Sequence, residues 1–578
     1  MTNTYLKSLF ALSIVALLAS CGSTSSVTGG GGLILTPVEN IDTTPLKIAD
    51  LTTSEKNNWG HLDLVADTIP GMSVNRAYDE IIKNRKGTKI IVAVLDSGID
   101  LNHEDLDDVL WTNTKEKAGN NKDDDGNGYI DDIHGYNFLG ESYNEQLEYV
   151  RMLRLNIGDA ATLSKAKAML DKKYNEALQG KQLYEQNKQL YEQNKQQYEQ
   201  ILQAVKIADS AVKKYLNKET YTQEDLTTIT TEDEAMQRNI AVLNQMFGIK
   251  NSIPEVVEEL NDGIEELSNG LEEVGDGIKY FSDQVNYNLN KDFIGREPVG
   301  DDPYDISDIA YGNGNPKNRV ADESHGTHVA GIIAAERNNG LGVNGVANNV
   351  AIMSIRAVPN GDEYDKDIAR GIRYAVDNGA RVINGSFGKS YSPKADWVYD
   401  AIKYAAEKNV LFVHAAGNDG ANLDDPTNGN FPNDQINNGP EISDNVITVG
   451  ALNPKYGSEL VASYSNYGKV NVDIFAPGTD IYSTYPNNEY EYSPGTSMAA
   501  PAVAGIAALV MSQYPSLTAA QVKKIILQSG LPIKTTVILG NDGKKSGSLN
   551  EISKSGKIAN AYNALVLASK VAARQIQL

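Results

Sequence analysis

Two kinds of hydrophobic pattern divide this chain. The run KIIVAVLD, which ends at Asp96, is apolar on both faces, as a strand in the middle of a parallel sheet should be. Between residues 143 and 290 the pattern changes to helical spacing in a stretch rich in Glu, Gln, Lys and Asn. The first pattern therefore predicts a central strand of a parallel sheet, and the second predicts an α-helical insertion.

The insertion contains two stretches with a seven-residue repeat. In the first, KQLYEQN occurs twice and KQQYEQ follows, and the a/d positions are Tyr184, Asn187, Tyr191, Asn194, Tyr198, Ile201, Val205, Ala208, Val212 and Tyr215. In the second stretch they are Val257, Leu260, Ile264, Leu267, Leu271, Val274, Ile278, Phe281 and Val285. With a shorter helix expected at 232–247 between them, these repeats predict an antiparallel coiled-coil arm whose ends return to the main domain.

Glycines recur in the second stretch with the same period, at Gly263, Gly270 and Gly277. Each costs about 1 kcal/mol relative to Ala inside a helix, so their repetition indicates that a partner helix approaches closely. The Tyr/Asn positions of the first stretch are polar for a coiled-coil core, which predicts a less rigid pairing there. Two roles for the arm are open: a spacer grown on a surface loop, or a docking or gating arm for a substrate, a partner protein or the cell wall.

Segments outside the insertion carry the candidate chemistry. Asp96 ends a strand, where open α/β sheets place their sites. His325 lies in HGTH before a small-residue helix, and Ser497 precedes the buried helix MAAPAVAGIAALVM, with Pro501 expected in its first turn. They supply an orienting carboxylate, a base and a nucleophile in the chain order Asp, His, Ser. Asn418, in VHAAGNDG, adds an amide of the kind that stabilises an oxyanion.

Each of these segments alone has a simpler explanation. An Asp after a strand is usually a turn or capping residue, and a Ser before a helix is usually an N-cap. His325 and His328 have the spacing of a metal-binding pair on a helix, but HGTH contains no acidic residue and no HExxH pattern, which disfavours zinc. The occurrence of all the segments in one order favours a catalytic site.

The order and the flanks of these segments resemble the subtilase family of serine endopeptidases. The resemblance implies a subtilisin-like α/β fold, with a mostly parallel sheet flanked by helices and interrupted by the α-helical insertion. It also implies that Ser497 attacks, His325 is the base and Asp96 orients the imidazole. It implies that Asn418 and the backbone N–H of Ser497 hold the oxyanion, and that peptide bonds are hydrolysed through an acyl-enzyme intermediate. His328 would be a structural neighbour of the site.

The same resemblance implies a cleft for protein or peptide substrates in an extended conformation. Its walls would be formed by Ser386, Phe387, Gly388, Ala415, Ala416 and Gly417. Two alternatives stay open. One is an inactive subtilase-like binding or adhesion module that works through the arm, which the presence of every catalytic residue disfavours. The other is a maturation protease with one native target.

The segment NKDDDGNGYIDD is the second strong signal. Its DxDxNG pattern matches the start of an EF-hand loop, but the twelfth position is His134 in place of Glu, so it is not an EF-hand. It resembles the calcium loops of exported bacterial subtilases, which predicts structural Ca²⁺ on Asp123, Asp125, Asn127, Tyr129, Asp131 and Asp132. The alternative is a solvated acidic turn.

The start of the chain predicts export. Residues 1–20 resemble a lipoprotein signal peptide, and Leu-Ala-Ser-Cys resembles a bacterial lipobox that would leave Cys21, the only cysteine, as the lipid anchor. Residues 21–32 are expected to form a flexible tether, and no other segment is expected to be apolar enough to span a bilayer. The sequence therefore predicts an exported lipoprotein of the bacterial cell envelope, and Gly22 favours the outer membrane.

The charge and the remaining segments complete the organisation. A formal net charge of −24 argues against a nucleic-acid partner, which requires a basic face. Residues 33–74 are expected to be an N-terminal extension packed on the catalytic domain, with a shortened propeptide as the alternative. The predicted catalytic domain comprises 75–142 and 291–570, and the predicted helical insertion comprises 143–290.

Overall fold

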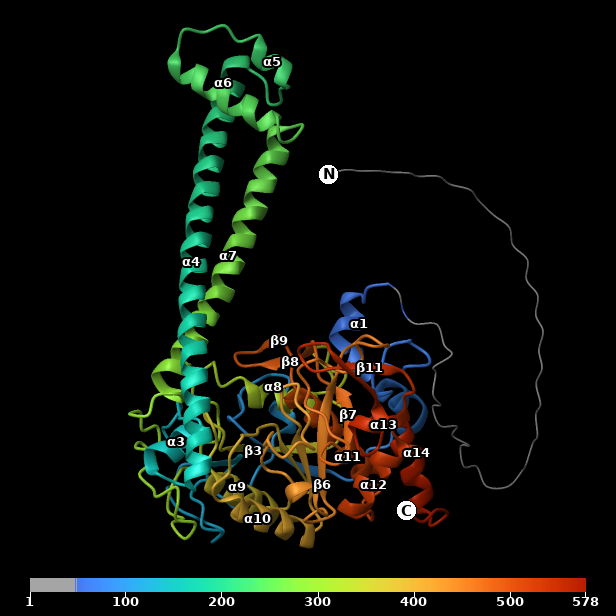
Figure 1. The fold of residues 1–578 in the computed structure, drawn as a ribbon. Coiled ribbons are helices and arrows are strands. Elements are labelled where there is room, and N and C mark those ends of the chain that lie inside the picture. Colours follow the sequence, from blue (N-terminus) through green and yellow to red (C-terminus); the bar gives the residue numbers. More distant parts are fainter. Residues whose placement is uncertain (1–46, 48) are drawn as a thin grey trace, which may run out of the picture. The chain divides into compact units, whose positions relative to one another are not determined.

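The computed structural model describes Lys47 and residues 49–578, and its centre is a nine-stranded sheet (Figure 1). The strand order is β10-β13-β7-β6-β5-β4-β1-β3-β2, and all neighbours are parallel except β10 and β13. The strands are β1 (Ile90–Asp96), β2 (Gly135–Asn137), β3 (Val350–Arg356), β4 (Val382–Gly385), β5 (Leu411–Ala415), β6 (Val446–Leu452), β7 (Ile474–Pro477), β10 (Leu531–Pro532) and β13 (Lys557–Ile558).

Helices cover both faces of this sheet. Ala93 and Leu95 of β1 belong to a buried cluster with α9 (Asp365–Asp377) and α10 (Ala395–Glu407). Because side chains alternate along a strand, the other residues of β1 face the opposite side, where α8 and α11 pack. The remaining elements of the domain are α8 (His325–Ala334), α11 (Thr496–Gln513), α12 (Ala519–Ser529), α13 (Leu549–Ile552), α14 (Ala561–Ala572) and the hairpins β8 (Ile481–Tyr485)/β9 (Glu489–Ser493) and β11 (Thr536–Leu539)/β12 (Lys545–Ser548). The predicted α/β fold is confirmed.

The helix α11 corrects two expectations. By length and composition alone it is long and apolar enough to cross a membrane. The expectation that no segment after the signal peptide is apolar enough to do so is therefore wrong. However, 89% of this stretch is buried inside the protein, which accounts for its apolar composition. The helix also begins at Thr496, so Pro501 lies beyond the first turn, inside the helix.

The insertion is helical, as predicted. Its elements are α3 (Glu148–Leu155), α4 (Ala160–Leu216), α5 (Gln223–Thr227), α6 (Glu234–Phe247), α7 (Ile253–Asp283) and a π-helical turn, Gln284–Asn288. The long helices α4 and α7 run antiparallel, side by side (Figure 1). The side chain of Asp159 caps the start of α4 by accepting from the N–H of Thr162, and Asn217 ends it in a left-handed conformation.

Tyrosines of α4 lie over the repeated glycines of α7. A Cβ added to Gly277 would lie 2.0 Å from the ring of Tyr184, and a Cβ on Gly270 would lie 2.2 Å from the ring of Tyr191. Gly263 and Tyr198 repeat the contact at 2.5 Å. Since a real Cβ cannot approach so closely, a larger residue at these positions would force the tyrosine ring to shift, and the close approach expected from the glycine repeat is present.

The first helix of the insertion is bonded into the catalytic domain. The buried Arg151 donates to Glu148 Oε2 at 2.6 Å and to the carbonyl oxygens of Asp362 and Glu363 at 2.7 and 3.0 Å. Lys389 donates to the same oxygen of Glu148 at 2.7 Å. Burial alone would raise the pKa of Glu148, but Arg151 and Lys389 lower it to about 2. The helix α3 is therefore anchored to the catalytic domain by buried charged groups.

The described part of the N-terminal extension lies against the catalytic domain. It contains α1 (Thr53–Asn58) and ends at Val74, where α2 (Val74–Arg76) and its π-helical continuation, Ala77–Ile82, begin. The buried Trp59 donates from Nε1 to the carbonyl oxygen of Thr479 at 3.0 Å, and Asn560 donates to the hydroxyl of Ser73 at 2.8 Å. The predicted signal peptide, the tether and Cys21 lie outside the described residues.

Candidate active site

The predicted carboxylate and base meet at the carboxyl end of β1. Asp96 is the last residue of the strand and is 1% exposed, and its Oδ1 accepts from His325 Nδ1 at 2.7 Å and from the N–H of Ser97 at 2.8 Å. Burial would lower the pKa of His325, but the Asp96 carboxylate outweighs it and raises that pKa. This bond leaves Nε2 of the ring as the atom that takes a proton.

A glycine permits this pairing. His325 is the first residue of α8, and Gly326 follows it. A Cβ on Gly326 would lie 2.2 Å from the carbonyl oxygen of Gly98. Only a residue without a side chain lets the start of α8 approach the end of β1 so closely.

Ser497 lies in the first turn of α11 and is joined to Ser386 in both directions. The Ser497 hydroxyl donates to the carbonyl oxygen of Ser386 at 3.1 Å, and the Ser386 hydroxyl donates to the carbonyl oxygen of Ser497 at 2.8 Å. The second bond is possible because Pro501 has no N–H to donate to that carbonyl. Within the described residues no hydrogen bond joins Ser497 to His325, so the hydroxyl must turn from Ser386 to reach the imidazole.

Asn418 is oriented by a residue that sequence reasoning missed. Thr496 donates to Asn418 Oδ1 from its N–H at 2.9 Å and from its hydroxyl at 3.0 Å, and this hydroxyl also accepts from the N–H of Gly417 at 3.0 Å. Because Thr496 binds the oxygen of the amide, the Nδ2 atom of Asn418 points away from Thr496. A Cβ on Gly495 would lie 3.6 Å from this Nδ2 and 3.5 Å from the backbone N of Ser497, so both predicted oxyanion donors flank the same gap.

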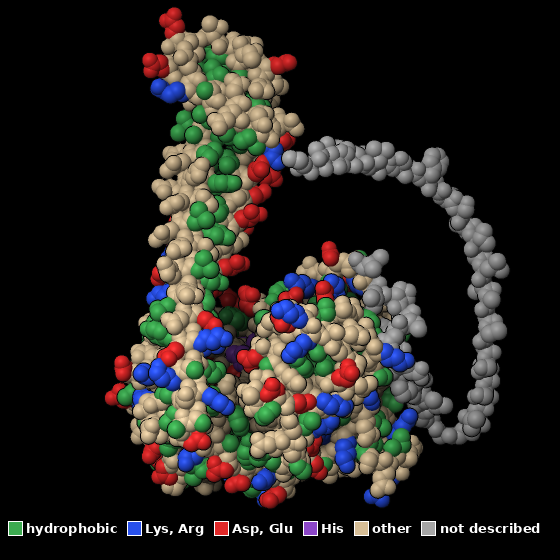
Figure 2. Space-filling view, in the orientation of Figure 1, with side chains coloured by type: hydrophobic (Ala, Val, Ile, Leu, Met, Phe, Trp, Pro, Cys, Tyr) green, Lys and Arg blue, Asp and Glu red, His purple; other side chains and the backbone are tan. Residues whose placement is uncertain are grey.

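The structure places the predicted cleft walls beside Ser497. They follow or end the neighbouring parallel strands β4 and β5, namely Ser386, Phe387 and Gly388 on one side and Ala415, Ala416 and Gly417 on the other. A cavity of about 450 Å³ lies between them, and its lining includes Phe387, Gly388, Ala415, Gly417, Asn418 and Ser497. Figure 2 shows a hollow beside the foot of the arm, in which histidine atoms are visible.

His328 has a structural environment. It is buried, and its Nε2 lies 3.0 Å from the carbonyl oxygen of Ile481 and 3.1 Å from that of Glu491. Burial lowers its pKa to about 4, so the ring is neutral near pH 7. These contacts bind α8 to the β8/β9 hairpin.

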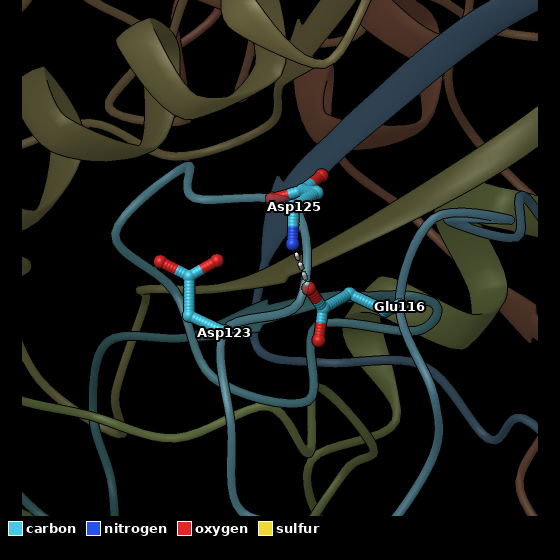
Figure 3. Close-up of side chains that lie close together, drawn as sticks. All are labelled: Glu116, Asp123 and Asp125. Carbon is cyan, nitrogen blue, oxygen red and sulfur yellow. Dashed lines mark hydrogen bonds between the residues drawn. The ribbon is translucent and has the colours of Figure 1, made fainter.

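The acidic loop brings together three carboxylates, one of which the sequence pattern did not reveal. Glu116 faces Asp123 and Asp125, and their nearest oxygens lie within 4.8 Å of one another (Figure 3). Glu116 Oε1 accepts from the N–H groups of Asp124 and Asp125 at 2.7 and 3.0 Å. Its Oε2 is buried and has no hydrogen-bond partner among the described residues. An unpaired, buried carboxylate oxygen between acidic neighbours fits a cation ligand.

The other predicted calcium ligands lie differently. Asp131 accepts from two backbone N–H groups of the same loop. Asp132 is fully buried and accepts from Tyr374 Oη at 2.7 Å and from Asn127 Nδ2 at 3.0 Å, and burial raises its pKa. The ring of Tyr129 packs edge-on against Tyr374. Asp131 and Asp132 are therefore not part of the three-carboxylate group.

Protein classes that share this catalytic geometry differ in the order of Asp, His and Ser along the sequence. Here Asp precedes His and His precedes Ser, and the site stands at the carboxyl ends of a parallel sheet, which defines a subtilisin-like protein. Comparison with known families agrees: the chain belongs to the subtilase family, whose model matches residues 87–554.

Similarity to characterised relatives is concentrated in parts of the chain. A thermophilic serine proteinase of Bacillus sp. (strain AK1) is 46% identical over 191 residues, which is 33% of this chain and 43% of that protein. Subtilisin DY of Bacillus licheniformis is 40% identical over 200 residues (34% and 67%), and a cell wall-associated protease of Bacillus subtilis (strain 168) is 36% identical over 231 residues (40% and 24%). The chain thus spans from 24% to 67% of the length of these relatives.

Proposed function

We propose that this protein is a serine endopeptidase that hydrolyses peptide bonds in extended segments of proteins. The observation that carries the proposal is the Asp96–His325 hydrogen bond, beside a gap flanked by the donors Asn418 and Ser497. The names of the relatives, which are proteinases, support the same activity.

The geometry suggests how each residue acts. The Ser497 hydroxyl leaves Ser386, gives its proton to His325 Nε2, and attacks the substrate carbonyl carbon. Asp96 stabilises the resulting imidazolium, and the oxyanion accepts hydrogen bonds from Asn418 Nδ2 and the N–H of Ser497. His325 then protonates the leaving amine, and water attacks the acyl-enzyme by the same route in reverse.

A fluorophosphonate probe tests this proposal directly. The wild-type protein should be labelled at Ser497 and should hydrolyse casein. Ser497→Ala should abolish labelling and lower turnover by several orders of magnitude with an unchanged circular dichroism spectrum, and His325→Ala should be similarly severe because the residues act as a unit. A folded wild-type protein that the probe does not label would instead support a binding or adhesion module.

We also propose that the acidic loop holds a structural Ca²⁺ through Glu116, Asp123 and Asp125. A cation bound only to the native state stabilises it by about 2.7 kcal/mol when its concentration is a hundred times Kd. Thermal unfolding should therefore occur at a lower temperature in chelator than in Ca²⁺, and Glu116→Gln should reduce this difference. Asp131→Asn is the matched control, because Asp131 lies outside the group. Equal unfolding temperatures in Ca²⁺ and chelator would contradict the proposal.

A further part of the proposal concerns location: an exported lipoprotein of the bacterial cell envelope, anchored through Cys21. The apolar stretch from Leu9 to Leu18 and the following Leu-Ala-Ser-Cys sequence support it. Cys21→Ser should release the protein from membranes or block signal processing, as followed by cell fractionation. Membrane retention of a correctly processed Cys21→Ser protein would contradict a lipid anchor at this position.

A further inference from the structure

The arm is continuous with the cavity beside Ser497. At the foot of the arm, the end of α7 and the turn after it contribute Tyr280 and Gln284 to the lining of that cavity, together with Tyr149 of α3. We call the part above the foot the shaft, which comprises residues 178–201 of α4 and 257–276 of α7. A polypeptide held along the shaft therefore leads directly to the proposed nucleophile.

The shaft leaves apolar side chains exposed to solvent. Among its residues, all of which the structure describes, Val274 is the only buried one. Leu183 and Leu190, which directly precede Tyr184 and Tyr191, are 55% and 53% exposed. Figure 2 shows hydrophobic side chains along the visible side of the shaft. Apolar side chains that repeat along an exposed helix form a face that an amphipathic partner can cover.

The outer face of α7 is acidic along the whole shaft. Between residues 258 and 276 the helix contains no Lys or Arg. Its exposed carboxylates are Glu258, Glu259, Asp262, Glu265, Glu266, Glu272, Glu273 and Asp276. Of these, only Glu259 forms an ion pair within the described part of the chain, with Lys250 at 3.0 Å. Figure 2 shows acidic side chains along the edge of the shaft on the side of the hollow.

The other helix of the shaft is balanced in charge. Each carboxylate of α4 in this region follows a lysine by four residues, as in Lys181 and Glu185, Lys188 and Glu192, and Lys195 and Glu199. This spacing places the two charges on neighbouring turns of one helix face. The uncompensated negative charge of the shaft therefore belongs to α7.

The charge of the cavity has the same sign. Its lining includes the carboxylates of Asp362 and Asp419. The lysines of the lining, Lys173 and Lys389, lie 3.4 and 2.7 Å from carboxylate oxygens of their own chain. A cationic chain that reaches the cavity from the shaft therefore meets carboxylates, and the lysines there are already paired.

We propose that the shaft is a docking surface for cationic amphipathic polypeptides, and that these are the substrates the protein prefers. Lysine and arginine side chains of the docked segment pair with the carboxylates of α7, and its apolar side chains cover Leu183 and Leu190. Docking raises the concentration of the adjoining segment at the cavity. The part of the inference that concerns substrates rests on the proposed endopeptidase activity, whereas the docking itself does not.

Binding is measured in the full chain carrying Ser497→Ala, which does not cleave the probe. The probes are two labelled helical peptides with the same leucine spacing, one with Lys and one with Glu at the flanking positions. Fluorescence anisotropy at low salt should show about tenfold tighter binding of the Lys peptide. The difference should shrink as salt is added, because exposed charges are screened. Equal affinity for the two peptides would overturn the inference.

Two triple variants with the same net charge locate the surface. The first, Glu266→Gln with Glu272→Gln and Glu273→Gln, removes three carboxylates from the shaft and should weaken binding of the Lys peptide about fivefold. The matched control removes three exposed carboxylates from α10, which lies on the far side of the catalytic domain from the shaft (Figure 1), through Asp396→Asn, Asp400→Asn and Glu407→Gln. The control should change binding less than twofold. Equal effects would indicate a general attraction to an acidic protein and would overturn the inference.

A neutral substitution tests the apolar part of the surface. The third repeat has Gln197 at the position of Leu183 and Leu190, so Leu183→Gln with Leu190→Gln suits the helix. This variant should weaken binding of the Lys peptide about threefold without changing the salt dependence. Unchanged affinity would show that the peptide does not cover this face.

The substrate preference is tested with active protein and one cleavable segment, joined to either peptide or to neither. KM should be about tenfold lower with the Lys peptide than with the Glu peptide, and kcat should be similar. The segment alone should be cleaved equally by the wild type and the α7 variant. Fluorophosphonate labelling reports the proposed activity separately. Labelling without selective binding would overturn the docking surface alone, and selective binding without labelling would overturn the proposed activity alone.

Discussion

The catalytic domain depends on single contacts between residues far apart in sequence, whereas the arm depends on one contact that repeats every seven residues. Asp96 and His325 are 229 positions apart and meet because β1 ends where α8 begins. In the arm, the contact between Gly270 and Tyr191 is one of a series in which each step of seven along α4 is matched by a step of seven along α7. Single contacts in the first region have no substitute, whereas contacts in the second are nearly equivalent copies.

The largest expected effect tests whether the arm and the catalytic domain unfold as one unit. Arg151→Ala leaves the buried carboxylate of Glu145 without its cation and leaves Glu148 with Lys389 alone, and removing one partner of a buried pair costs about 3–5 kcal/mol. Chemical denaturation should show a loss of this size for the whole protein. Lys167→Ala, at an exposed pair on α4, should change stability by less than about 0.5 kcal/mol. An equally small effect for Arg151→Ala would mean that the arm is independent from α3 onward.

The next prediction tests whether a catalytic contact is irreplaceable. Asn418→Leu removes one of two donors at the oxyanion gap, and the loss of such a donor lowers kcat by about a hundred- to a thousandfold. KM should change little, because the oxyanion exists only after attack. Steady-state kinetics on a chromogenic peptide measures both parameters. A defect found mainly in KM would mean that Asn418 binds the substrate instead.

The next prediction has a smaller expected effect and tests the packing of tyrosine rings over glycines in the arm. Gly270→Ala should destabilise the arm by about 1–3 kcal/mol through overpacking against Tyr191, although Ala is the better helix former by about 1 kcal/mol. Gly275→Ala is the matched control in α7, because a Cβ there meets nothing within 4 Å and should be stabilising. Amide hydrogen exchange along α4 and α7 would report both changes. Stabilisation by Gly270→Ala would contradict the ring-over-glycine packing.

The smallest effect concerns pH. His325 must be neutral to accept the proton, and Asp96 raises its pKa above the ordinary value of 6.5. Activity should therefore rise with pH, and the acid limb of kcat/KM should have its midpoint above 6.5. Asp96→Asn removes the carboxylate that favours the charged ring, so it should move this midpoint to lower pH. An unmoved midpoint would assign the limb to another group.

The sequence was sufficient for features whose signal is local. The strand before Asp96, the helix after Ser497 and the helical insertion each follow from a short pattern of apolar residues, and the structure contains all three. The repeat of glycines in the arm also predicted a close approach of two helices, whereas its pairing with the tyrosines of α4 became visible only in the structure. In each case the deciding residues are neighbours in sequence, so their spacing carries the information.

Features that depend on distant contacts were not accessible in this way. Glu116 precedes the DxDxNG pattern, and only the folding of the loop brings it to Asp123 and Asp125. Tyr149 lies in a segment interpreted as part of a separate arm, and its place beside the cavity depends on how α3 packs. In neither case does a nearby residue in the sequence indicate the contact.

The ring-over-glycine register also restricts how the arm can change length during evolution. Removing a few residues from α4 alone would slide each tyrosine off its glycine and onto a residue with a side chain. A viable change must delete or duplicate one repeat in both helices together, a step of fourteen residues that alters the reach of the arm by about 10 Å. Arm lengths among descendants of this gene should therefore be quantised.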